Sequence, residues 1–112
     1  MFKIKQTPEF FWPVEVQVAG DGGKYERQSF DALFRRKTDT QIQELRERIE
    51  RGELTDRAFC REVLAGWKGI SDEGQDVPFS ETALEQVLDV PGVAAAIVLA
   101  YANAHSGVVR KN

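Results

Sequence analysis

The stretch GWKGISDEGQDVPFS, residues 66–80, places the large side chain of Trp67 between two glycines. An acidic run broken by Gly74 follows, and Pro78, Phe79 and Ser80 close it. Such a stretch can be a metal-binding loop, a catalytic turn or a structural joint between two helices. The segments on either side of it are needed to choose among these three.

The N-terminal third of the chain carries the pattern of a β-hairpin. Apolar and polar residues alternate over residues 10–18, as in a strand with one buried face. GDGG, residues 20–23, supplies positive φ angles at little steric cost and reads as a turn. A second strand then alternates up to Phe34. The sequence therefore predicts a hairpin over residues 10–34, and because an isolated hairpin is marginal in water, its apolar face must pack on the rest of the chain.

Helix start signals recur in the remainder, residues 38–105. Thr38, Thr55 and Ser80 each precede an apolar stripe of helical spacing, and hydroxyl side chains of this kind cap helix N-termini. The Pro91-Gly92 pair separates a third helix from a fourth. We therefore expect a single α+β domain over residues 1–112: an N-terminal β-hairpin packed on a bundle of about four short α-helices.

The second of these helices is expected to run into the quoted stretch. Phe59, Val63 and Leu64 lie on one side of it, and Trp67 extends that side by one turn. The glycines that flank Trp67 would then end the helix. After the last helix, the polar residues 106–112 are expected to form a flexible tail.

The fourth helix is apolar on almost every side over residues 93–102. A helix without a polar face lies either in the centre of a core or against a partner. Our hypothesis is that it contacts a sister subunit or another protein, with a contact surface formed by Val93, Ile97, Ala100 and Tyr101. The alternative is that this helix is the middle of the core of a single chain.

Composition excludes several classes of function. The chain has 112 residues, a net charge of −3 and 29% charged residues, a balance that gives no general attraction to nucleic acid or anionic lipid. Its one cysteine, Cys60, permits no internal disulfide and fits a reducing compartment. No signal peptide is apparent, and the longest apolar run is about half of the ~20 residues that span a bilayer. We expect a soluble cytoplasmic protein.

The acidic run does not match a metal or catalytic site. A calcium loop that began at Asp72 would need a glycine at its sixth position and a glutamate at its twelfth, where the chain has Ala83. Cys60 and His105 are the only residues of their types, too few for zinc, and a lone thiol on the apolar side of a helix is usually inert. We expect no enzyme, no cofactor and no metal.

The quoted stretch is therefore interpreted as a joint. Trp67 places its indole on the apolar side, Gly74 takes a left-handed conformation in a solvated turn, and Phe79 folds back next to the cap at Ser80.

Two segments also resemble the tail assembly chaperones of long-tailed bacteriophages. VLAGWKGISDEGQDVPFSETALEQVLDVP, residues 63–91, is similar to that family's central signature: a helix ending in Gly-Trp, an acidic glycine-containing turn and a Pro-Phe-Ser start to a Leu-rich helix. SFDALFRRKTDTQIQEL, residues 29–45, is similar to its alternating-Phe strand, basic stretch and helix. The residues that match the motif are expected to be structural: Trp67, Gly69, Gly74, Pro78 and Phe79.

The resemblance implies a non-enzymatic role. Chaperones of this family bind the long helical tape measure protein, keep it soluble and help to recruit tail tube subunits, and they are absent from the finished particle. Two alternatives stay open. One is another tail or connector protein that remains in the particle. The other is a small regulatory domain that binds nucleic acid through Arg35, Arg36 and Lys37, which the acidic balance of the chain disfavours.

Overall fold

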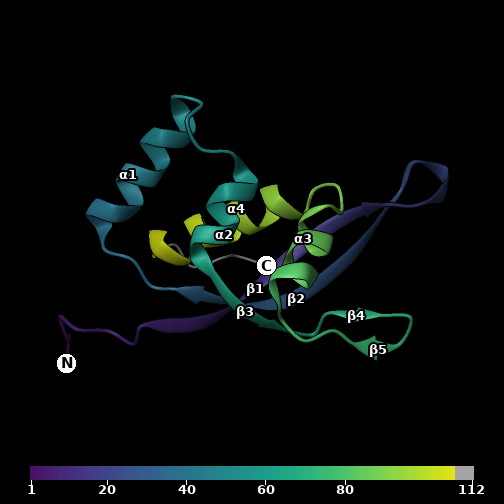
Figure 1. The fold of residues 1–112 in the computed structure, drawn as a ribbon, viewed down its shortest axis with the longest axis horizontal. Coiled ribbons are helices and arrows are strands. Elements are labelled where there is room, and N and C mark those ends of the chain that lie inside the picture. Colours follow the sequence, from purple (N-terminus) through teal and green to yellow (C-terminus); the bar gives the residue numbers. More distant parts are fainter. Residues whose placement is uncertain (108–112) are drawn as a thin grey trace.

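The computed structural model describes residues 1–107 and shows an α+β fold (Figure 1). The predicted hairpin and the four predicted helices are present, and three further short strands lie between the second and third helices. The elements in chain order are β1 (Glu9–Ala19), the 3-10 turn η1 (Asp21–Gly23), β2 (Tyr25–Arg35), α1 (Asp39–Glu50), α2 (Asp56–Val63), β3 (Leu64–Lys68), β4 (Ser71–Asp72), β5 (Gln75–Asp76), α3 (Glu81–Leu88) and α4 (Val93–Ser106). Of the tail predicted over residues 106–112, Ser106 belongs to α4, and residues 108–112 lie outside the described part of the chain.

The main sheet is antiparallel with strand order β1-β2-β3. The register of the hairpin runs from Glu9 opposite Arg35 to Ala19 opposite Tyr25, and β1 forms one edge of the sheet. Side chains therefore alternate between two faces. Helices α1, α2 and α4 lie on one side of the sheet in Figure 1. The face toward them carries the buried residues of the hairpin, which are Val14, Val16, Ala32 and Phe34.

The prediction that the second helix continues to Trp67 is wrong. Helix α2 ends at Val63, and the next residue already begins β3, which pairs with β2. In this register Trp67 lies opposite Ala32 and Gly66 opposite Leu33, whose side chain would lie 3.4 Å from a Cβ atom at position 66. The apolar residues of the segment fit a strand as well as a helix, and pairing with a strand about thirty residues earlier decides between them.

The helix start signals were predicted correctly. Thr38 and Gln41 form a reciprocal capping box at α1, and Thr55 and Ser80 accept hydrogen bonds from the backbone of α2 and α3. Gly92, with φ of 87°, precedes α4. These contacts form between residues a few positions apart, so the sequence alone specifies them.

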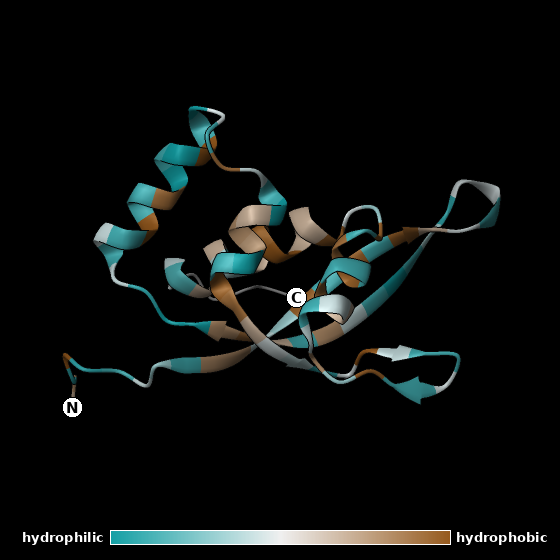
Figure 2. Ribbon diagram, in the orientation of Figure 1, coloured by the Kyte–Doolittle hydropathy of each residue, from teal (hydrophilic) through white to brown (hydrophobic). Residues whose placement is uncertain are grey.

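Helix α4 lies in the centre of the core, against β1 and α2. Tyr101 is 1% exposed, its ring meets Phe34 and Phe59 edge-on, and its hydroxyl donates to the carbonyl oxygen of Arg35 at 2.7 Å. In Figure 2, α1 is mainly hydrophilic with a narrow hydrophobic stripe, whereas α4 is hydrophobic along most of its length. The layers that cover α4 therefore explain the apolar residues on its buried side, whereas Ala95, Leu99 and Ala102 are exposed.

Candidate partner-binding surface

The motif residues hold β3 to the segment that enters α3. Trp67 is half-buried, its Nε1 atom donates to the carbonyl oxygen of Val77 at 2.8 Å, and its ring meets Phe79 edge-on with centroids 4.8 Å apart. Phe79 is also half-buried, whereas Pro78 is exposed. The indole of Trp67 therefore connects strand β3 to the segment that enters α3. The sequence had predicted that it connects two helices.

The acidic run forms a small hairpin of its own, β4–β5. Asp72 lies opposite Gln75, and the two residues between them, Glu73 and Gly74, have φ angles of 50° and 77°. Two positive φ angles in a two-residue turn are typical of type I′, which suits Gly at the second position. Gly69 also has a positive φ, 83°, at the exit from β3. The predicted left-handed conformation of Gly74 is confirmed.

A groove of about 560 Å³ lies between the main sheet, the β4–β5 hairpin and α3. Apolar side chains make up the larger part of its lining, beside the polar residues Gln28, Ser29, Ser71 and Gln86. Among the described residues that line it, Asp72 is the only charged one. The apolar lining comes from five separate parts of the chain and includes Val18, Phe30, Ile70, Val87, Val90 and Val93. Val90 is 44% exposed, so an apolar surface remains open to solvent there.

The four residues proposed from the sequence as a contact surface do not form an exposed patch. Val93, Ile97, Ala100 and Tyr101 are 5%, 0%, 7% and 1% exposed and belong to the core, which was the alternative interpretation. Only Val93 also lines the groove. The large apolar residue that α4 exposes is instead Leu99, at 62%.

The other groove residues were not identified from the sequence. Ile70 and Val77 flank the acidic run. Two apolar residues beside an otherwise polar turn are the sequence feature that could have indicated an apolar surface there. Val87 and Val90 lie close to the Pro91-Gly92 break, where helical periodicity stops giving information.

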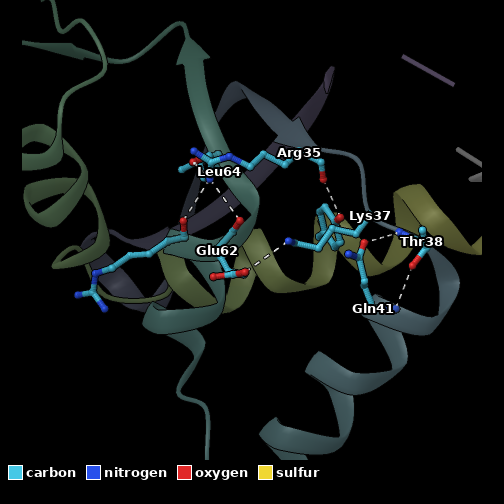
Figure 3. Close-up of polar contacts among 8 residues, drawn as sticks. Arg35, Lys37, Thr38, Gln41, Glu62 and Leu64 are labelled. Atoms are coloured by element: carbon cyan, nitrogen blue, oxygen red, sulfur yellow. Dashed lines mark hydrogen bonds and ion pairs between the residues drawn. The ribbon is translucent and has the colours of Figure 1, made fainter. Parts of the chain in front are cut away.

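The basic cluster that suggested a nucleic-acid site is engaged with the chain itself (Figure 3). The Nη1 atom of Arg35 lies 3.0 Å from the carbonyl oxygen of Leu64 and within 3.3 Å of two others at the end of α2. Arg36 donates to the carbonyl oxygen of Thr7 at 2.7 Å, and its guanidinium lies over the ring of Phe10. Lys37 pairs with Glu62 at 3.4 Å, and its side chain is 17% exposed. These contacts brace the joint between the sheet, α1 and α2.

The titratable groups of the core are not arranged for nucleophilic chemistry. Burial raises the pKa of Cys60 to about 12, and its thiol contacts the carbonyl oxygen of Ala94 at 3.5 Å. Burial also raises the pKa of Tyr101 to about 12. The ring of His105 packs against Phe10 and Tyr101, whereas the thiol of Cys60 contacts Ala94, near the other end of α4. A thiol that stays protonated at neutral pH is a poor nucleophile.

Two further features bear on the kind of partner. Residues 1–107 contain no group of three or more His, Cys, Asp and Glu side chains placed to hold a metal ion. Within the same residues, no single helix is long and apolar enough to cross a membrane; α3 and α4 meet that test only as a pair, bent by 101°.

Comparison with known proteins supplies the family. A family model described as phage tail assembly chaperone matches residues 1–112. The chain belongs to the phage tail assembly chaperone family. Chaperones of this family are non-enzymatic. The functional site of such a protein is a surface that binds tail proteins. No curated protein and no solved structure matches the chaperone significantly.

Proposed function

We propose that this chaperone binds the tape measure protein of the tail and keeps it soluble during assembly, in the cytoplasm of the bacterial host. The observation that carries the proposal is the open apolar groove, because a long, partly hydrophobic helical client needs an apolar surface to cover it. Helix-in-groove recognition uses apolar anchors on one side of the client helix, and the groove lining offers apolar contacts from both the sheet and α3. Tail tube subunits are a second expected partner, and the chaperone leaves before the particle is complete.

In this proposal the residues of α4 have two roles. Val93 contacts the client directly, since it lines the groove. Ile97, Ala100 and Tyr101 hold α4 against the sheet and so fix the position of that wall. The basic residues at positions 35–37 have no part in binding, because they are engaged within the chain.

Co-expression with the tape measure protein of the same phage tests the proposal. We expect the wild-type chaperone to raise the soluble fraction of the tape measure protein several-fold, and Val87→Glu/Val90→Glu to abolish that gain, because two carboxylates in an apolar groove are costly to bury. Leu99→Glu is the matched control: it also adds a carboxylate at an exposed apolar position, outside the groove. Equal solubility with and without the chaperone would overturn the proposal.

The same experiment separates the alternative of a structural tail or connector component. Purified particles should lack the chaperone, whereas a connector protein would remain in them at a fixed copy number.

A further inference from the structure

The first five residues, MFKIK, lie outside the sheet, and apolar and basic side chains alternate over residues 2–5. Phe2 is 85% exposed and Ile4 is 95% exposed. In the single chain the segment bends at Ile4 and Lys5, and the side chain of Gln6 donates to the carbonyl oxygen of Lys3. Straightened into an extended form on docking, it would place Phe2 and Ile4 on one side and Lys3 and Lys5 on the other. Large apolar side chains that gather in solvent indicate a contact that the single chain does not make.

In the structure, residues 1–5 do not line the groove of their own chain. Arg36 fixes the chain just before β1, through its backbone N–H to the carbonyl oxygen of Pro8 and through Nε to that of Thr7. Phe2 is five residues before Thr7 and reaches at most about 18 Å from it. The groove begins level with Phe30, whose partner in β1, Val14, lies about 23 Å from Thr7 at ~3.3 Å per residue. In Figure 1 the N-terminus and the β4–β5 hairpin lie at opposite ends of the molecule.

The groove and the segment are complementary in both polarity and charge. The groove lining is mainly apolar, and the hairpin at its edge carries Asp72, Glu73 and Asp76. Within residues 1–107, no ion pair joins these three carboxylates to a basic side chain. A volume of about 560 Å³ is within the range of sites that enclose a small ligand or a few side chains.

We propose that residues 2–5 of one copy dock in the groove of a second copy. Phe2 and Ile4 enter the apolar lining, while Lys3 and Lys5 lie beside the acidic hairpin. Self-docking and client binding then use the same groove, so the tape measure protein displaces the segment. The contact between copies stands independently of the tape measure assignment.

Sedimentation velocity across a concentration series tests the contact. We expect the wild-type chain to associate with rising concentration, less so at high salt because the charge contacts are screened. Phe2→Ser/Ile4→Ser should associate at least tenfold more weakly, and it leaves the core untouched because both side chains are exposed. Leu99→Ser is the matched control and should associate like the wild type. A wild-type chain that is monomeric at every concentration, or a double variant that associates equally well, would overturn the proposal.

A charge exchange tests the orientation. Lys3→Glu/Lys5→Glu and Asp72→Lys/Asp76→Lys should each weaken association, and the combination of all four should restore it. Failure of the combined variant to recover would overturn the pairing of segment and hairpin.

The segment variant also separates this proposal from the assigned client. Phe2→Ser/Ile4→Ser retains the groove, so it should still raise the solubility of the tape measure protein if that assignment is right. Association that depends on Phe2 and Ile4 supports self-docking whether or not the tape measure protein is bound.

Discussion

Trp67 makes both an apolar and a polar contact, and the two can be separated by substitution. Its ring packs on Phe79, and its Nε1 atom donates to the carbonyl oxygen of Val77. Trp67→Phe keeps most of the ring but leaves that carbonyl without its donor, so we expect a loss of about 1–2 kcal/mol in the free energy of unfolding. Trp67→Ala removes the ring as well, and because the ring is half-buried we expect a loss near the lower end of the range for buried aromatics, about 3 kcal/mol, which is a large share of the stability of a domain of this size.

Urea denaturation of the purified variants measures both values. Tyr25→Ala is the control, because Tyr25 is an aromatic residue of the same sheet that is 71% exposed, and its loss should change stability by less than about 0.5 kcal/mol. If Trp67→Ala unfolded at the wild-type urea concentration, the indole would not be an anchor.

At the scale of the elements, the change from α2 to β3 without an intervening loop depends on Arg35. Its guanidinium contacts three carbonyl oxygens across the helix end and the first strand residue (Figure 3). Arg35→Met keeps the length of the side chain and removes the donors. We expect a loss of about 1–2 kcal/mol and faster hydrogen exchange in β3, while α1 keeps its protection.

Arg27→Met is the control for Arg35→Met. Arg27 lies on the same strand and pairs with Glu15 at 3.1 Å, but its side chain is 69% exposed, so the change should cost less than about 1 kcal/mol. Equal exchange rates in β3 for the two variants would contradict a specific role for Arg35.

The same helix-to-strand change marks the limit of what the sequence could predict. The caps at Thr38, Thr55 and Ser80 were predicted because each depends on residues three positions away. The apolar spacing of residues 64–67 fits the period of a helix as well as that of a strand, so the sequence predicted a continued helix. Only the pairing of β3 with β2 in the folded chain selects the strand. The groove could not be predicted either, since Phe30, Ile70 and Val87 meet only after the sheet and α3 are in place.

At the scale of the whole molecule, His105 joins the end of α4 to the start of β1. Its ring packs edge-on against Phe10, with centroids 5.5 Å apart, and lies 4.5 Å from that of Tyr101. Its Nε2 atom is buried and has no hydrogen-bond partner within residues 1–107. Burial, with a smaller contribution from the charge of Arg36, lowers the pKa of His105 in the folded chain. The fold is therefore built around the neutral imidazole.

This arrangement predicts that the whole fold loses stability in mild acid. In the unfolded chain His105 has its ordinary pKa of about 6.5, so below that pH the unfolded chain binds a proton more readily than the folded chain does. The contribution of His105 to the free energy of unfolding is therefore complete above about pH 6.5 and is lost as the pH falls toward the lowered pKa of the folded chain. His105→Phe keeps a ring between Phe10 and Tyr101 but cannot titrate. Urea denaturation between about pH 5.5 and 7.5 should therefore give a flatter pH dependence for this variant than for the wild type, because the carboxylates contribute equally to both. If the free energy of unfolding varied with pH in the same way for both proteins, His105 would have the same pKa in the folded and unfolded chains. The stability of the fold would then not depend on a neutral His105.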